Sequence, residues 1–99
     1  DVLFQRDDGK WGVLDYKTSY VKEYQGHKTR NLVIEHARRY HLQIGVYAAA
    51  IQEQVGVIPE AHIYYIRYGE TVNVKADEWQ SALHNLEHLI GELLEDQAE

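Results

Sequence analysis

Asp15 and Lys17 are two residues whose types and spacing could do chemistry. They lie two positions apart in the sequence, in and just after the apolar-rich run Lys10 to Tyr16. On a β-strand both side chains therefore leave the same face. A carboxylate that holds a divalent cation, beside an amine that steers or activates a water molecule, can serve phosphodiester hydrolysis. The spacing alone is a weak pattern, because a surface ion pair at a strand edge has the same sequence.

A predicted β-hairpin adds a second carboxylate, Asp1. Two apolar-rich runs flank an Asp-Asp-Gly segment that ends at Gly9, and such a segment favours a tight turn. A three-residue loop with Gly9 in the left-handed conformation pairs Arg6 with Lys10 and sets Asp1 opposite Asp15. Directly opposed Cβ atoms lie roughly 4.5 to 5.5 Å apart, close enough for two carboxylates to share one cation. A two-residue turn would shift the register by one and separate them.

Gln43 and Tyr47 form a third element, one helical turn apart on a predicted long helix. The helix is expected from about Leu32 to Gln54, with Gly56 near its C-cap and Pro59 just beyond. Tyr47 taken alone indicates core packing. Gln43 lies at the edge of an apolar stripe, and a buried amide there would need hydrogen-bond partners.

The elements that must position these residues follow from periodicity. The long helix is apolar on two sides, which predicts a place between a sheet and another helix. One stripe holds Val33, Tyr40, Ile44, Tyr47 and Ile51, the opposite side holds Leu42, Val46 and Ala49, and a narrow polar arc holds Arg38, His41, Gly45 and Gln52.

The rest of the chain completes an α+β fold. Residues 61–68 are predicted to form a buried strand, Gly69-Glu70 a turn and 71–74 a short partner strand. A final helix is expected over 77–95, with an apolar stripe of Trp79, Leu83, Leu86, Ile90, Leu93 and Leu94. The order ββαββα predicts a single α+β domain with a mixed or antiparallel central sheet flanked by helices.

Composition excludes several classes of protein. The 99 residues suit one small domain, and the sequence contains no Cys, which excludes disulfide frameworks, Cys-ligated zinc and iron-sulfur clusters. No run is long and apolar enough for a membrane span and no signal peptide is visible, so we expect a cytoplasmic protein without a membrane partner. The net charge of −6 disfavours nucleic acid, but residues 17–39 carry a local balance of +4 and residues 76–99 one of −7.

Three stretches together carry a specific resemblance. They are Asp1-Val2-Leu3-Phe4, Gly12-Val13-Leu14-Asp15-Tyr16-Lys17-Thr18-Ser19 and Gln43-Ile44-Gly45-Val46-Tyr47. A strand Asp, an Asp-Tyr-Lys-Thr element and a Gln-x-x-x-Tyr helix in this order resemble the RecB-family nucleases of the PD-(D/E)XK type. The nearest likeness is to the nuclease domain at the end of AddA-type helicase-nucleases, and it runs from Asp1 to about Tyr68.

The resemblance implies a metal-dependent DNA nuclease with a restriction-endonuclease-like core, acting in recombination and repair beside a helicase part. It implies that Asp1, Asp15 and the Tyr16 carbonyl bind Mg²⁺ or Mn²⁺ and that Lys17 positions the water and stabilises developing charge. Gln43 and Tyr47 would line the site and hold Lys17 or the DNA backbone. Aromatic and basic side chains would contact a single strand, with a merely solvated loop as the alternative. These are Tyr20, Lys22, Lys28, Arg30 and Arg39.

Family members carry a helix and a strand before the first Asp, whereas this sequence starts at Asp1. The expectation is therefore an N-terminally truncated fragment, and its activity by itself is in question. The alternative function is a nuclease-fold binding or assembly module that self-associates through an incomplete sheet.

A second motif, His84-x-x-Glu87-His88, matches an inverted zinc-protease pattern. Its histidines lie opposite the apolar stripe, which predicts solvent exposure and no zinc site.

Overall fold

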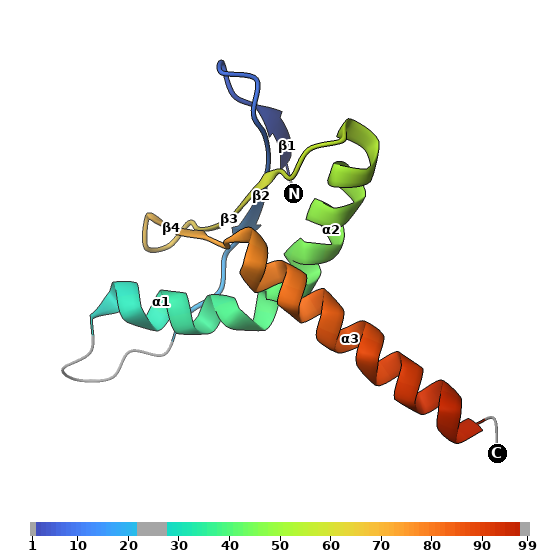
Figure 1. Cartoon of the computed structure of the whole chain (residues 1–99). Coiled ribbons are helices and arrows are strands. Elements are labelled where there is room, and N and C mark those ends of the chain that lie inside the picture. Colours follow the sequence, from blue (N-terminus) through green and yellow to red (C-terminus); the bar gives the residue numbers. More distant parts are fainter. Residues whose placement is uncertain (1, 22–27, 98–99) are drawn as a thin grey trace.

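The computed structural model describes residues 2–21 and 28–97, which form an α+β structure of one mixed sheet and packed helices (Figure 1). The elements are β1 (Val2–Gln5), β2 (Trp11–Lys17), α1 (Thr29–Ala37), the 3₁₀ turn η1 (Arg38–Tyr40), α2 (His41–Val55), β3 (Glu60–Tyr65), β4 (Glu70–Asn73) and α3 (Ala76–Gln97). Their order agrees with the predicted ββαββα pattern, except that the central helix is broken.

The hairpin of β1 and β2 has the register that the turn chemistry predicts. Gly9 has a φ of +87°, and its N–H donates to the Arg6 carbonyl at 2.9 Å. The Arg6 N–H donates to the Lys10 carbonyl at 2.8 Å, so the loop has three residues. The ladder then runs from Gln5 with Trp11 to Val2 with Leu14. The predicted three-residue loop is confirmed.

The four strands lie in the order β1-β2-β3-β4, with β2 and β3 parallel and both outer pairs antiparallel. A parallel pair needs a long crossover, and here α1, η1 and α2 supply it. The mixed sheet is therefore confirmed, and β2 is an interior strand. Tyr65 pairs with Lys17 at the carboxyl end of the parallel pair. The predicted strand over residues 61–68 is too long, since β3 ends at Tyr65.

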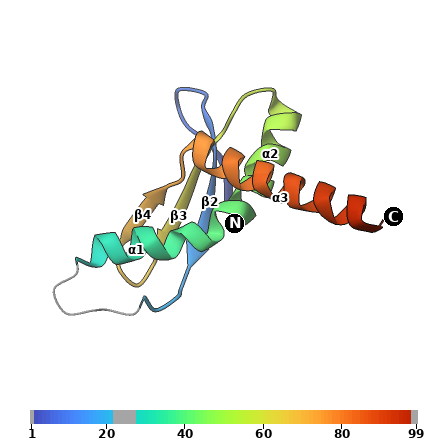
Figure 2. The same cartoon turned by 60° about the horizontal axis from the view of Figure 1, so that its bottom comes forward.

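The predicted single helix over residues 32–54 is wrong in two respects. It begins earlier, at Thr29, and is interrupted by η1 at Arg38–Tyr40. Figures 1 and 2 show that α1 and α2 run in different directions, with α1 crossing the strands near their lower end in Figure 2. The predicted C-cap is confirmed, since Gly56 has a left-handed φ of +79° and its N–H donates to the Gln52 carbonyl.

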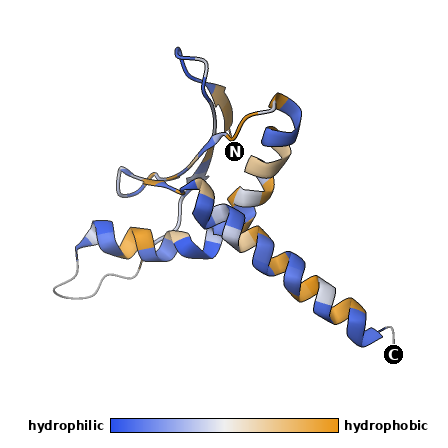
Figure 3. Ribbon diagram, in the orientation of Figure 1, coloured by the Kyte–Doolittle hydropathy of each residue, from blue (hydrophilic) through white to orange (hydrophobic). Residues whose placement is uncertain are grey.

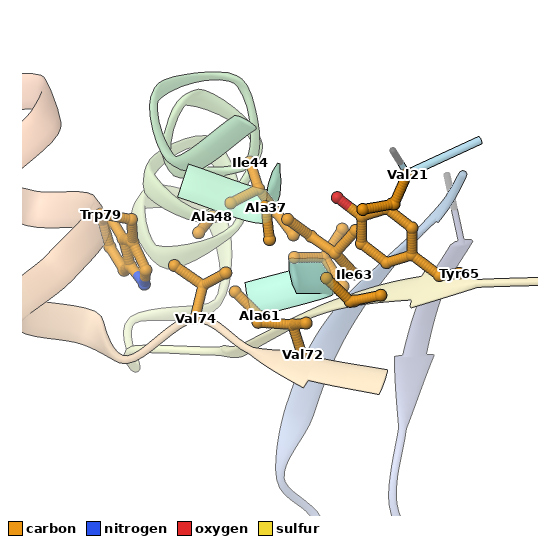
Figure 4. Packing of buried hydrophobic residues seen from close by; sticks show 12 residues of the cluster. Val21, Ala37, Ile44, Ala48, Ala61, Ile63, Tyr65, Val72, Val74 and Trp79 are labelled. Carbon is orange, nitrogen blue, oxygen red and sulfur yellow. The ribbon is translucent and has the colours of Figure 1, made fainter. Parts of the chain in front are cut away.

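The core lies between one face of the sheet and the helices (Figure 4). Its members are Val13, Val21, Val33, Ala37, Ile44, Ala48, Ala61, Ile63, Tyr65, Val72, Val74 and Trp79. As predicted, α2 lies between the sheet and another helix, α3. The periodicity placed Gly45 on the polar arc, but Gly45 is buried. It packs closely against Trp79: an added Cβ would lie 3.1 Å from both the Cβ and the carbonyl oxygen of Trp79.

α3 matches the predicted final helix, but the second half of its apolar stripe is exposed. Trp79 is 1% exposed, whereas Ile90, Leu93 and Leu94 are 46%, 54% and 61% exposed. Figure 3 shows hydrophobic positions recurring along the part of α3 that extends away from the sheet. None of the helices within residues 2–21 and 28–97 is both long and apolar enough to cross a membrane.

Candidate active site

Asp15 and Lys17 form an ion pair on the helix-covered face of β2. Lys17 Nζ lies 3.0 Å from Asp15 Oδ2, and the two side chains are only 16% and 8% exposed. Asp15 is the one charged residue that is buried among the described residues. The alternative, a surface ion pair at a strand edge, is therefore wrong, because β2 is interior and the pair lies under the helices.

The chain that follows Lys17 is fixed by the turn after β3. The Ile66 N–H donates to the Lys17 carbonyl at 3.1 Å, and Arg67 Nε donates to the Thr18 carbonyl at 2.6 Å. The Arg67 guanidinium also lies 3.6 Å from the centre of the Tyr20 ring. Further on, the Val21 N–H donates to the Tyr68 hydroxyl at 2.9 Å. The end of the Asp-Tyr-Lys-Thr segment and the residues after it are thus held by backbone and side-chain contacts at the carboxyl end of the parallel strands.

Three residues that the sequence patterns did not assign to the site form a chain of contacts that begins at Lys17. Lys17 Nζ lies 4.0 Å from the centre of the Tyr40 ring, within the range of a cation–π contact. The Tyr40 ring packs against His36 with ring centroids 5.6 Å apart. His36 Nδ1 lies 2.7 Å from the hydroxyl of Tyr65, which is fully buried. The sequence signal that could have drawn attention to Tyr40 is its place three residues before Gln43.

Burial perturbs the two ends of this contact chain. Desolvation, and then the nearby Tyr40, raise the pKa of the Tyr65 hydroxyl to about 12. Desolvation, followed by the positive charges of Arg39 and Lys17, lowers the pKa of His36 below its usual 6.5. At neutral pH the two side chains are therefore a neutral pair that can share one hydrogen bond.

The other predicted catalytic and metal-binding residues differ in their placement. Asp1 lies outside the described residues. The Lys17 carbonyl accepts from the Ile66 N–H, just after β3. Because successive carbonyls alternate in direction along a strand, the Tyr16 carbonyl points to the β1 side of β2. Gln43 is exposed and Tyr47 is 41% exposed. The expectation of a buried Gln43 amide is wrong, and neither side chain hydrogen-bonds Asp15 or Lys17 within residues 2–21 and 28–97.

The predicted nucleic-acid-binding residues do not form a single loop. Tyr20 is 76% exposed and Lys28 and Arg39 are exposed, whereas Lys22 lies outside the described residues. Arg30 belongs to α1, and its guanidinium binds Glu70 at 2.9 Å and the Thr71 carbonyl at 2.6 Å.

No three His, Asp or Glu side chains gather into a metal-binding group in the part of the chain that the structure describes. The zinc-protease pattern on α3 has the solvent exposure that the sequence predicts. His84 and His88 are both exposed, and His88 Nε2 lies 3.0 Å from Glu92.

Comparison with known proteins reveals a relationship to a much longer protein. The chain is similar to an ATP-dependent helicase/nuclease subunit of Clostridium novyi (strain NT), with 36% identity over 70 residues. The match covers 71% of this chain and 5% of that protein, so the chain spans a small part of its relative. No family model matches, and no solved structure matches. The similarity supports a relation to the helicase/nuclease subunits.

Proposed function

We propose that this chain is the catalytic part of a metal-dependent DNA nuclease that hydrolyses phosphodiesters. It would have the restriction-endonuclease-like core of the RecB-type PD-(D/E)XK enzymes and act within a helicase-nuclease in recombination and repair. The observation that carries the proposal is the buried Asp15–Lys17 pair at the end of β2. A buried charge pair is costly to keep as a purely structural element, which favours a chemical role. The similarity to a helicase/nuclease subunit supports the same interpretation.

The donor groups fit Mg²⁺ or Mn²⁺. The Asp15 carboxylate and the Tyr16 carbonyl are hard oxygen ligands, and Mg²⁺ is commonly held by one or two carboxylates, with waters and substrate phosphates as further ligands. Asp1 would add a second carboxylate. When bound, such a cation supplies Lewis-acid polarisation of the phosphate and a more acidic water.

The residues of this chain would divide the remaining work. Lys17 would orient the attacking water and stabilise the negative charge that develops on the phosphate. The Asp15 carboxylate, 3.0 Å from Lys17 Nζ, would keep the positive charge of the Lys17 ammonium at the strand end. The exposed Tyr20, Lys28 and Arg39 would contact a single DNA strand, because stacking and positive charge act on any sequence.

The test is cleavage of labelled single- and double-stranded DNA with Mg²⁺, Mn²⁺ or EDTA. The proteins compared are this chain, a version extended upstream of Asp1, Asp15→Asn and Lys17→Ala. Asp7→Asn is a matched control, because Asp7 is an exposed acid in the hairpin turn. We expect metal-dependent cutting that both site variants abolish and the control retains.

A second, activity-independent measurement is titration with Mn²⁺ while NMR line broadening is followed. We expect broadening centred on Asp15 and Tyr16 that Asp15→Asn removes and Asp7→Asn does not. If the extended protein neither cuts DNA nor shows this broadening, the nuclease proposal is wrong.

A second candidate is a binding or assembly module without catalysis. It is favoured by the edge position of β1, where Val2 and Leu3 are 42% and 53% exposed. Sedimentation analysis separates the two candidates: self-association in a chain that does not cut DNA supports the module, and an active monomer refutes it.

A further inference from the structure

The Lys17 ammonium has more contacts than an ion pair alone supplies. One of its three N–H donors meets Asp15 Oδ2 at 3.0 Å, and the face of the Tyr40 ring lies 4.0 Å from the nitrogen. The ring is a weak acceptor that attracts the cation without neutralising it. The remaining donor capacity is thus available for a water or a phosphate oxygen.

The break in the helix brings Tyr40 to this position. Tyr40 is the last residue of η1 and precedes α2, with φ −106° and ψ 2°, close to the sparsely populated bridge region. The ring therefore lies over the end of β2 because the chain changes direction there.

Two further side chains restrain the Tyr40 ring. His36, one turn earlier in the chain, contacts Tyr40 at 5.6 Å between ring centroids and Tyr65 at 5.5 Å. The Tyr65 hydroxyl lies 2.7 Å from His36 Nδ1, and Tyr65 itself is fully buried on β3. A buried residue of the sheet thus fixes a residue of α1, which in turn packs on Tyr40.

We propose that Tyr40 is a positioning residue that holds the Lys17 ammonium beside Asp15, and that the His36–Tyr65 pair fixes its ring. This inference rests on the proposed nuclease function. It gives Tyr40 the role of holding Lys17, which the sequence resemblance assigned to Gln43 or Tyr47. Both of those are exposed here, whereas Tyr40 contacts the ammonium directly.

The experiment compares Tyr40→Leu with Tyr40→Phe. Leu keeps apolar bulk without an aromatic face, while Phe keeps the face and removes only the hydroxyl. Tyr64→Leu is the matched control, because Tyr64 lies on the opposite face of the sheet from Lys17 and packs on Tyr16. Kinetics use the extended protein with Mn²⁺ and labelled single-stranded DNA.

We expect Tyr40→Leu to lower kcat about tenfold, equivalent to about 1.4 kcal/mol, with little change in KM. Tyr40→Phe and Tyr64→Leu should stay within about twofold of the unmodified protein. Tyr65→Phe should lower kcat by less than Tyr40→Leu. Added to Tyr40→Leu, it should cause no further loss, because it acts through the same ring.

A spectroscopic readout makes the test independent of activity. In the protein labelled with ¹³C-lysine, protons over an aromatic face are shifted upfield, so the Lys17 ε-methylene signal should be upfield and assignable from its loss in Lys17→Arg. Tyr40→Leu should move it to the position of an exposed lysine, and Tyr40→Phe should not.

An unmoved signal in Tyr40→Leu, or equal kcat for Tyr40→Leu and Tyr40→Phe, overturns the inference. If the unmodified protein does not cut DNA at all, the proposed function fails, and the lysine signal still decides whether Tyr40 holds Lys17.

Discussion

Replacing Lys17 with Met tests whether burial, rather than the N–O distance, decides how much its ion pair with Asp15 contributes to the free energy of unfolding. Met keeps the length and apolar character of the side chain but leaves the Asp15 carboxylate, 8% exposed, without the ammonium. Breaking a buried pair from one side costs about 3 to 5 kcal/mol. The lower end applies here, because Lys17 is still 16% exposed and water can reach the carboxylate.

The matched control is Arg6→Met. Arg6 Nη1 lies 2.7 Å from Glu60 Oε1, closer than the Lys17–Asp15 contact, but the side chains are 49% and 30% exposed. Exposed pairs contribute about 0 to 1 kcal/mol. The shorter ion pair should therefore be the less important one.

The assay is thermal and urea unfolding at pH 7, followed by circular dichroism. For a domain of this size 1 kcal/mol shifts Tm by about 4 to 8 °C, so Lys17→Met should lower Tm by at least about 12 °C. Arg6→Met should lower it by less than about 8 °C. Equal shifts for the two variants would refute the claim that the Asp15 charge is buried and dependent on Lys17.

Three further predictions concern the helices and His36. Trp79→Ala should lower the free energy of unfolding by about 3 to 5 kcal/mol, because it leaves a cavity in the core. Leu93→Ala on the exposed part of α3 should change it by less than about 0.5 kcal/mol, and urea titration of the two variants makes the comparison. Gly91→Ala should stabilise α3 by up to about 1 kcal/mol, because a Cβ there meets nothing within 4 Å. Gly56→Ala should destabilise the end of α2, because its φ is +79°, so the Tm shifts of the two variants should have opposite signs. The folded state lowers the pKa of His36 and so binds its proton less tightly than the unfolded chain does. The free energy of unfolding should therefore be highest above pH 6.5 and fall as the pH drops below it; in unfolding curves at pH 7.5 and 5.5, His36→Gln should reduce this difference.

The parts of the fold that depend on local chemistry could be predicted from the sequence. The hairpin register follows from Gly9, whose left-handed φ fixes a three-residue loop. The end of α2 follows from Gly56 in the same way. The alternation of β2 correctly placed Asp15 and Lys17 on one face.

The break at Arg38–Tyr40 could not be predicted, because residues 32–54 contain no Pro and no Gly near residues 38–40. It follows from tertiary packing: α1 lies on β4, while α2 lies on β2, β3 and α3. A single helical wheel drawn through both helices assumes one axis. Its polar arc therefore included the buried Gly45, and its apolar stripe included the half-exposed Tyr47.

The site itself depends on the pairing of β2 with β3, which no local pattern encodes. Lys17 and Tyr65 are Cα partners in this parallel ladder, so both side chains leave the same face at the carboxyl ends of the strands. The crossover between them passes through η1 and places Tyr40 over that same point. A slip of one residue would put Tyr64, which faces the other way, beside Lys17 and leave His36 without the Tyr65 hydroxyl. The geometry of the candidate site is therefore a property of the parallel register, and the Asp-Tyr-Lys-Thr segment supplies only half of it.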